Sequence, residues 1–319
     1  MKIYSSLSQW NQEPLENPVL TLGVFDGVHL GHQDLIRQQK EWSSQVGGQA
    51  LILTFTRHPQ SVLQKNLAFP LIQTIEHRLR IFEELAVEGV LLLPFDQELA
   101  LMTPEEFFRK IICQELQCHY FLLGYDSRFG YQGRGDFPLA LNLGKANGVE
   151  VRQGKVFLWE GKPLSSSMIR NSIQKGQLQG AGRMLGRPYS FLAKIIKGQG
   201  MGRKLGFPTA NLDLQSILVP PYGVYMVEVA ILPHWQSPIK KSYSALMNIG
   251  VRPTINGGKR QVEVHIPHFE GDIYGQYLHV AVGPKIRDEK KFQSLEELED
   301  QIQKDCQLLE ELLKEGKPF

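Results

Sequence analysis

Residues 19–42 read VLTLGVFDGVHLGHQDLIRQQKEW. The run from 19 to 25 is apolar and rich in strand-forming residues, and residues 33–42 fit a helix. In an open α/β sheet, the turn between such a strand and helix lies at the carboxyl end of the strand, where ligands bind. The stretch therefore predicts an α/β sheet with a ligand site at this turn.

Outward from this stretch, strands and helices alternate through the first half of the chain. The further apolar, β-rich runs are residues 50–55, 90–93, 120–123 and 149–151. Between them, Ile75, Leu79 and Phe82 recur at helical spacing, and Thr103 followed by Pro104 is typical of a capped helix start. This alternation predicts a parallel sheet covered on both faces.

The pattern changes after about residue 180. Strand-like runs separated by Gly and Pro turns cover residues 223–231, 243–249 and 262–266, and they predict an antiparallel sheet or barrel. The Gly-rich stretch 176–186 is the expected linker. We therefore predict two domains, residues 1–181 and 182–319.

A last helix is predicted to begin at Ser294, with Glu297 completing a capping box. Its apolar stripe is expected to pack against the barrel. The stripe consists of Leu295, Leu298, Ile302, Leu309 and Leu313.

Composition excludes several classes of protein. Among 319 residues, 42% are hydrophobic and 21% charged, which is typical of globular proteins. With 35 Lys and Arg against 33 Asp and Glu, the net charge of +2 gives no electrostatic case for nucleic acid or an anionic membrane as the main partner. The amino terminus does not fit a signal peptide, and the three cysteines match no metal spacing. We expect a cytoplasmic protein with reduced thiols.

The turn after the first long strand carries His29 and His32, with Gly31 between them. A helix amino terminus offers unpaired N–H groups to a phosphate, and imidazoles there can stabilise charge on a transferring phosphate. Gly31 would let the ligand approach the backbone closely. Two other interpretations are a tight turn with two exposed histidines and a zinc site, for which no further ligand is suitably spaced.

Two more patches favour the phosphate interpretation, although each is weak alone. Residues 165–167 place three serines at a predicted helix start, one turn before Arg170. Arg57 and His58 form a basic pair at the end of the strand 50–55.

These segments resemble the two signatures of the nucleotidylyltransferase superfamily. The signatures are GVFDGVHLGH at 23–32 and SSSMIR at 165–170, and GYDSRFG at 124–130 is similar to the flavin-adenylylating branch. The family is that of the prokaryotic bifunctional riboflavin kinase/FMN adenylyltransferases (FAD synthetases). The resemblance implies a Rossmann-like nucleotidylyltransferase domain, followed by a small Greek-key β-barrel with a carboxyl-terminal helix.

The resemblance also implies roles in the first domain. His29 and His32 would contact the ATP phosphates, and Arg170 would steady the departing pyrophosphate. The other residues implied in ATP and phosphate binding are Gly23, Phe25, Asp26, Gly31, Ser166 and Ser167. Those implied near the flavin or adenine are His58 and Asp126.

Three positions depart from the family pattern. Arg57 stands where Pro is usual, Ser127 where Phe is usual, and Met168 where Arg is usual. Ser127 removes a possible stacking ring, and Met168 removes a positive charge near pyrophosphate. Because neither change touches the histidine pair, we expect altered affinity and retained chemistry.

A second site is expected in the second domain, where a glycine-rich run at 198–203 precedes KLGFPTAN at 204–211. Thr209 and Asn211 lie two residues apart in an extended segment, so their side chains point the same way. Their oxygens are ligands that Mg²⁺ accepts alongside nucleotide phosphates. Residues 208–211 are the hallmark of the riboflavin kinase module. The resemblance implies ATP binding by Gly198, Gly200, Arg203, Gly206 and Pro208.

Glu263 is the candidate general base, between Val262 and Val264 on a strand. Alternation turns Glu263 to the opposite face from both valines. With the valines in the core it would face solvent, but the resemblance favours an interior site with Glu263 pointing inward. His265 has the same parity and is either a neighbour of the base or a structural residue.

Two further residues are implied in flavin binding, Arg287 and Phe292. The alternative for Arg287 is a solvated face shared with Asp288.

The resemblance thus implies an enzyme acting on riboflavin, FMN, FAD and ATP with Mg²⁺. It would phosphorylate riboflavin to FMN and then adenylylate FMN to FAD, releasing pyrophosphate. The rival hypotheses are an enzyme with one live activity, a flavin-sensing regulator and a nucleic-acid-binding barrel. Retention of Thr209, Asn211 and Glu263 counts against the regulator, and the near-neutral charge counts against nucleic-acid binding.

Overall fold

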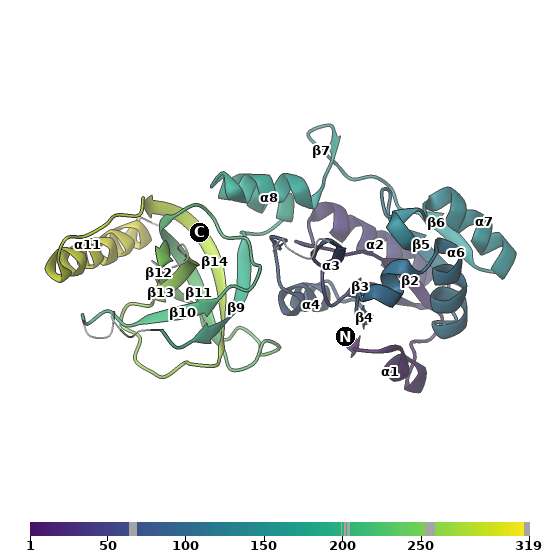
Figure 1. Ribbon diagram of the computed structural model, residues 1–319, viewed down its shortest axis with the longest axis horizontal. Helices are drawn as coiled ribbons and strands as arrows, with labels where there is room; N and C mark the ends of the chain where they lie inside the picture. Colours follow the sequence, from purple (N-terminus) through teal and green to yellow (C-terminus); the bar gives the residue numbers. More distant parts are fainter. Residues whose placement is uncertain (64–68, 199, 201, 203–204, 253–258, 316–319) are drawn as a thin grey trace. The chain divides into compact units, whose positions relative to one another are not determined.

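The computed structural model describes residues 1–63, 69–198, 200, 202, 205–252 and 259–315 (Figure 1). The chain forms two compact units. The first comprises Met1–Phe69 and Arg78–Ser165, and the second comprises Pro70–His77 and Ser166–Phe319. The predicted boundary between residues 181 and 182 falls inside the second unit, and as a division between two activities it stays a prediction.

The first unit contains a six-stranded parallel sheet, as predicted, with the order β1-β4-β3-β2-β5-β6. The strands are β1 (Lys2–Tyr4), β2 (Pro18–Leu22), β3 (Gln49–Phe55), β4 (Gly89–Leu93), β5 (Tyr120–Leu123) and β6 (Glu150–Gln153). Consecutive residues such as Val19 and Leu20 are both fully buried, which requires cover on both faces of the sheet. Strand β1 was not predicted from the sequence, because a strand of three residues is too short to show the alternation of apolar and polar residues.

Helices connect these strands. They are α1 (Leu7–Gln12), α2 (Leu30–Gln45), α3 (Pro59–Leu63), α4 (Ile75–Glu84), α5 (Gln97–Leu101), α6 (Pro104–Phe107), the π-helix η1 (Phe108–Glu115), the 3₁₀-helix η2 (Tyr131–Gly133) and α7 (Phe137–Asn147). The predicted helix start at Thr103 is confirmed, because its side chain accepts from the Glu106 N–H while the Glu106 carboxylate accepts from the Thr103 N–H.

The expected linker at 176–186 is wrong. After the short strands β7 (Leu158–Trp159) and β8 (Lys162–Pro163), the chain forms α8 (Ser166–Gln174) and α9 (Leu178–Leu185). Ala181, Met184 and Leu185 are buried on one side of α9, so the segment packs as a helix in spite of its glycines. Gly186, at a φ of +72°, ends the helix in the left-handed conformation that glycine adopts without strain.

The second unit is built around a closed barrel with the strand order β10-β13-β12-β11-β14-β9, and all neighbouring strands are antiparallel. The strands are β9 (Ser190–Ile196), β10 (Thr209–Asp213), β11 (Gly223–Leu232), β12 (Tyr243–Arg252), β13 (Lys259–His265) and β14 (Tyr277–Arg287). The predicted antiparallel barrel is therefore confirmed.

One face of the barrel wall is its apolar interior. On β12 and β13, Met247 pairs with Val264 and Ile249 with Val262, and each side chain is at most 1% exposed. The outer face of the same wall is covered by α11 (Leu295–Lys314), because Leu309 packs there in one cluster with Val224, Met226 and Leu246 (Figure 1).

Helix α11 begins as predicted, since Ser294 caps it by accepting from the Glu297 N–H. The Glu297 carboxylate accepts from the Gln293 N–H rather than from the cap residue, so the predicted capping box is only half formed. The predicted stripe is wrong at its ends, where Leu295 and Leu313 are 54% and 39% exposed.

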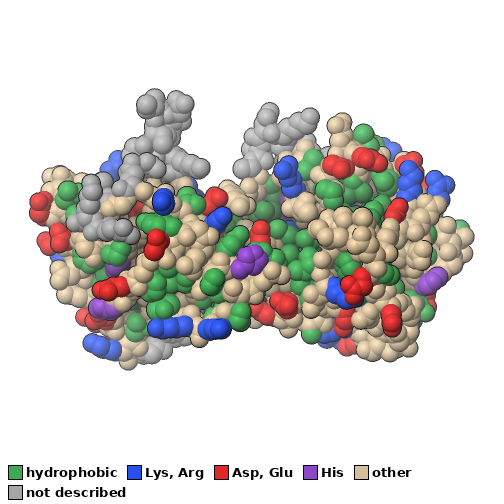
Figure 2. Space-filling model, turned by 90° about the horizontal axis from the view of Figure 1, so that it is seen from below, with side chains coloured by type: hydrophobic (Ala, Val, Ile, Leu, Met, Phe, Trp, Pro, Cys, Tyr) green, Lys and Arg blue, Asp and Glu red, His purple; other side chains and the backbone are tan. Residues whose placement is uncertain are grey.

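On the face drawn in Figure 2, acidic and basic side chains are interspersed, in keeping with 35 basic and 33 acidic residues in the chain. Across the described ranges, none of the helices is long and apolar enough to cross a membrane.

Candidate active sites

The turn between β2 and α2 has a strained backbone. Phe25 and Val28 adopt positive φ angles of 54° and 38°, and Gly27 adopts 88°. Such angles are costly for residues other than glycine and concentrate at functional sites. The strand therefore ends at Leu22 instead of continuing to Phe25 as predicted, and the chain turns sharply toward the helix.

The two histidines come together at the start of α2. The His29 ring stacks on His32, with centroids 3.6 Å apart, and its Nδ1 accepts from the His32 N–H at 3.3 Å. His29 thereby caps the helix. This contact leaves Nε2 to carry the ring proton in the neutral form, so Nε2 is the donor.

His29 is only 4% exposed, which counts against the alternative of a tight turn with two exposed histidines. The space that Gly31 leaves is filled by this ring, because a Cβ at Gly31 would lie 3.2 Å from His29 Nδ1. Gly31 thus makes room for the histidine stack, and the predicted approach of a ligand to its backbone stays a prediction. Asp26 and Phe25 are also buried in the turn. Within the described residues, no group of three or more His, Cys, Asp and Glu side chains is arranged to hold a metal ion.

A cavity of about 350 Å³ lies in the first unit beside this turn. Gly23 forms part of its wall, and Ser127 to Gly133 contribute another part. The aromatic residues that line it are Phe55, Phe95, Phe107, Phe129 and Tyr131. The first signature and the flavin-branch segment therefore share one apolar cavity.

Two predicted flavin ligands of the first unit lie outside the wall of this cavity. Asp126 is exposed, and the lining begins at the next residue, Ser127. His58 is half-buried and stacks on Phe69 at 4.0 Å, while its neighbour Pro59 lines the cavity. Their predicted flavin contacts stay predictions.

Helix α8 begins at Ser166, which places the serine run at its amino terminus as expected. Ser167 is exposed, and the Arg170 Nε donates to the carbonyl oxygen of Pro70 at 3.1 Å. These residues belong to the second unit, whereas His29 and His32 belong to the first. That they meet around one nucleotide stays a prediction.

In the barrel, β10 and β13 bring the predicted kinase residues side by side. Thr209 lies opposite His265, and Asn211 opposite Glu263, in the antiparallel register. All four line a cavity of about 330 Å³ between the outer barrel wall and α11. The sequence-predicted residues Arg287 and Phe292 line it too.

The inward orientation predicted for Glu263 is wrong. Val262 and Val264 fill the barrel interior, and Glu263 faces the outer cavity. Alternation separates the glutamate from the valines, and burying an unpaired charge in the apolar interior would be costly. The base candidate keeps a pocket environment because α11 covers this side of the barrel.

Gln261 belongs to the same site and was missed from the sequence. Its Nε2 donates to Glu263 Oε1 at 2.8 Å and also to Asn211 Oδ1. The amide thus joins the candidate base to a candidate metal ligand. The available signal was its position two residues before Glu263, which puts both side chains on one face of the strand.

Glycines near this site serve close packing at some positions and permit a positive φ angle at others. A Cβ at Gly198 would lie 2.2 Å from Asn211 Nδ2, and one at Gly202 would lie 2.4 Å from the Phe207 carbonyl oxygen. Gly200 and Gly206 have positive φ angles of 71° and 82°. Arg203, predicted to bind ATP, lies outside the described residues.

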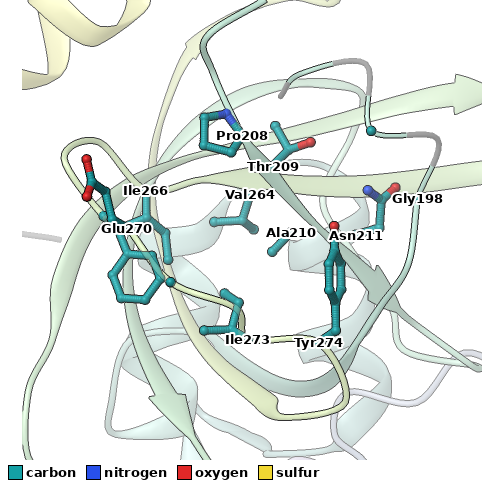
Figure 3. A pocket seen from close by; sticks show the side chains of 13 residues that line it. Gly198, Pro208, Thr209, Ala210, Asn211, Val264, Ile266, Glu270, Ile273 and Tyr274 are labelled. Carbon is teal, nitrogen blue, oxygen red and sulfur yellow. The ribbon is translucent and has the colours of Figure 1, made fainter. Parts of the chain in front are cut away.

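The barrel has a smaller cavity as well, of about 280 Å³ (Figure 3), which shares part of its wall with the larger barrel cavity of about 330 Å³. Both cavities are lined by Gly200, Thr209 and Asn211. Gly198 and Pro208 line only the smaller cavity, and Glu263 lines only the larger one. Figure 3 shows Ile273 and Tyr274 across this smaller cavity from Pro208 and Thr209.

His265 and Arg287 also line the larger barrel cavity. His265 Nδ1 lies 2.9 Å from the Pro208 carbonyl oxygen, and burial lowers the pKa of its imidazole. Arg287 is tied to Asp305 by a two-pronged ion pair, whereas Asp288 pairs with Lys285. The alternative of a solvated face therefore holds for Asp288, whose side chain is 91% exposed, but not for Arg287, whose side chain is 22% exposed.

Comparison with known proteins finds a family match over each of the two halves of the chain. The family model of riboflavin kinase matches residues 185–313, and that of FAD synthetase matches residues 11–168. The bifunctional riboflavin kinase/FMN adenylyltransferase of Escherichia coli (strain K12) is 33% identical over 305 residues, 96% of each chain. This chain belongs to that family.

Another member of the family and one solved structure also match nearly the whole chain. The bifunctional riboflavin kinase/FMN adenylyltransferase of Bacillus subtilis is 33% identical over 304 residues, covering 93% of this chain and 92% of its own. A crystal structure described as a macrolide-efflux protein from Streptococcus pneumoniae superposes with a TM-score of 0.79 at 30% identity. It covers 97% of this chain, and 99% of that chain is covered in return.

As a bifunctional riboflavin kinase/FMN adenylyltransferase, the chain is an enzyme of FAD synthesis that uses riboflavin, FMN and ATP. The family assignment removes the regulator and the nucleic-acid-binding barrel from consideration. Of the three departures from the family pattern, Arg57 is exposed, Ser127 lines the aromatic cavity and Met168 is half-buried on α8.

Proposed function

We propose that the smaller barrel cavity binds ATP, that the larger one binds riboflavin, and that phosphoryl transfer takes place where they meet. The observation that carries this proposal is the shared wall formed by Thr209 and Asn211. A base must reach the attacking hydroxyl, so it belongs on the flavin side, and Glu263 lines only the larger cavity.

The Thr209 hydroxyl and the Asn211 carbonyl oxygen fit Mg²⁺, which prefers oxygen ligands and is commonly bound together with nucleotide phosphates. Asn211 Oδ1 accepts one hydrogen bond from Gln261 and keeps a second lone pair for the metal. When bound, Mg²⁺ would neutralise charge on the phosphates. Glu263 accepts the proton of the riboflavin hydroxyl, whose oxygen attacks the terminal phosphorus of ATP, and ADP departs.

Thr209→Ala and Asn211→Ala are each expected to raise the Mg²⁺ concentration needed for half-maximal FMN formation and to weaken ATP binding. Removing one oxygen ligand should cost roughly 1–3 kcal/mol, about a 5- to 150-fold loss. Titrating Mg²⁺ while separating the flavin products measures this. If neither variant changes the Mg²⁺ requirement or the ATP affinity, residues 208–211 form only a structural turn.

For FAD formation, we propose that the aromatic cavity of the first unit receives the flavin ring of FMN. Its size and lining support this assignment, since pockets for small molecules and cofactors are typically of about this volume and are lined mainly by apolar and aromatic side chains. His29 and His32 would donate to ATP phosphate oxygens as charge develops on them. Ser166, Ser167 and Arg170 would hold the leaving pyrophosphate.

We also propose that residues 182–319 carry the kinase activity by themselves. Every candidate kinase residue, from Gly198 to Phe292, lies in this range. The fragment should phosphorylate riboflavin but melt below the full chain. It lacks Ile72, which is fully buried, and Leu71, whose N–H donates to the Ser216 carbonyl oxygen at 2.8 Å. A fragment that is folded by circular dichroism yet inactive would contradict the division.

A further inference from the structure

Asp305 is a buried acid in the carboxyl-terminal helix to which the proposed phosphoryl transfer assigns no role. It is 5% exposed and lines the larger barrel cavity from α11. Its Oδ1 accepts from Arg287 Nε at 2.9 Å, and its Oδ2 accepts from Arg287 Nη2 at 2.7 Å. Gln301 Nε2 also donates to Oδ1 at 3.0 Å. Both oxygens are therefore engaged, and the carboxylate is held in one orientation.

Arg287 lies at the end of β14 and lines the same cavity. A paired fork of hydrogen bonds fixes the plane of its guanidinium group as well as its position. The group lies 6.0 Å from the Phe292 ring centroid, and Phe292 is another lining residue. Asp305 thus fixes the orientation of a cation that lies beside an aromatic ring in the cavity wall.

The same contact fixes the helix over the cavity. Leu309 anchors α11 to the barrel one turn further along, next to Met226 and Leu246. At the cavity, the helix contributes the apolar side chains of Leu298 and Ile302. The ion pair between Asp305 and Arg287 ties this part of α11 to the barrel strand opposite.

Burying an ion pair is expensive, and an apolar pair of similar size often stabilises a protein as well or better. An ion pair retained in the wall of a ligand cavity therefore calls for a role in that cavity. We propose that Asp305 is a positioning residue for flavin binding: it orients Arg287 and holds α11 as the second wall of the cavity. This inference rests on the proposed binding of riboflavin in that cavity.

The test compares Asp305→Asn with Asp288→Asn in the full chain. Asp288 directly follows Arg287 in the chain, but its side chain is 91% exposed and pairs with Lys285, so it is the matched control. Riboflavin affinity is measured without turnover, by quenching of flavin fluorescence. Affinity for Mg²⁺ with ADP is measured by calorimetry, and steady-state kinase kinetics give KM and kcat separately.

We expect Asp305→Asn to weaken riboflavin binding and raise its KM on the order of tenfold, because a charged hydrogen-bond pair is lost. The kcat and the affinity for Mg²⁺ with ADP should stay within about threefold of wild type, since Asp305 lines only the larger cavity. Asp288→Asn should match wild type in every measurement.

Two results would overturn the inference. One is unchanged riboflavin affinity in folded Asp305→Asn. The other is an equal loss of affinity for Mg²⁺ with ADP, which would make Asp305 a general support of the barrel. If Asp305→Asn does not fold, Gln301→Leu removes only the hydrogen bond that orients Oδ1, and the same comparison applies to it. Wild-type protein that fails to bind riboflavin would instead contradict the proposed function.

Discussion

Replacing Glu263 by Gln is expected to abolish FMN formation while FAD formation from supplied FMN continues at nearly the wild-type rate. A general base contributes about 10²–10⁴-fold, so the loss should be plain in a product assay. Gln keeps the size of the side chain and removes only its ability to accept a proton. Glu263 lies in the barrel, and the predicted adenylyl-transfer histidines lie in the other compact unit, so the second activity is an internal control.

Glu289→Gln is the matched control for this change. Glu289 is a second carboxylate that lines the larger cavity, where it accepts from the Val251 N–H at 3.2 Å. If loss of any negative charge in the cavity slowed the kinase, both variants would be impaired to a similar extent. Kinase activity within threefold of wild type in Glu263→Gln would remove Glu263 from the role of base.

The strands of the first unit were predictable because burial on both faces leaves continuous apolar runs. Four of the five predicted runs match the observed strands to within about two residues. The remaining run, predicted at residues 19–25, extends too far, because the backbone enters the left-handed region at Phe25. That region is disfavoured for Phe and Val, so nothing in residue preferences indicates a turn that the surrounding structure imposes.

Local pattern also misled the prediction for residues 176–186. The glycines indicated a linker, but Ala181, Met184 and Leu185 share one face and are buried together. Tertiary packing of an apolar face outweighs the helix penalty of a few glycines, which is about 1 kcal/mol each.

In the barrel, the sequence determined which residues share a face but not which face is inside. Thr209, Asn211 and Glu263 were correctly grouped by period and by the resemblance. The prediction placed Glu263 inward because the sequence does not reveal that α11 encloses a cavity on the outer wall. Asp305 was missed for a related reason: its partner Arg287 is 18 positions away, on a different element.

The histidine pair is expected to be as important for FAD formation as Glu263 is for FMN formation. Removing the His32 or His29 imidazole should lower kcat for FAD synthesis by about 10²–10³-fold, the usual loss when a donor to developing charge is removed. FMN formation from riboflavin should continue in both variants, because the candidate kinase residues lie in the other compact unit. Separate assays of the two reactions test this directly.

His29 needs a more careful variant than alanine, because it also caps α2 and is 4% exposed. His29→Ala should lose about 0.5–2 kcal/mol of stability with the cap, so its lower activity alone would be ambiguous. Asn is among the best cap residues but lacks the imidazole Nε2 donor. His29→Asn should therefore melt close to wild type and still lose FAD synthesis. If it makes FAD at the wild-type rate, His29 acts only as a cap, and the phosphate donor must be sought elsewhere in the turn.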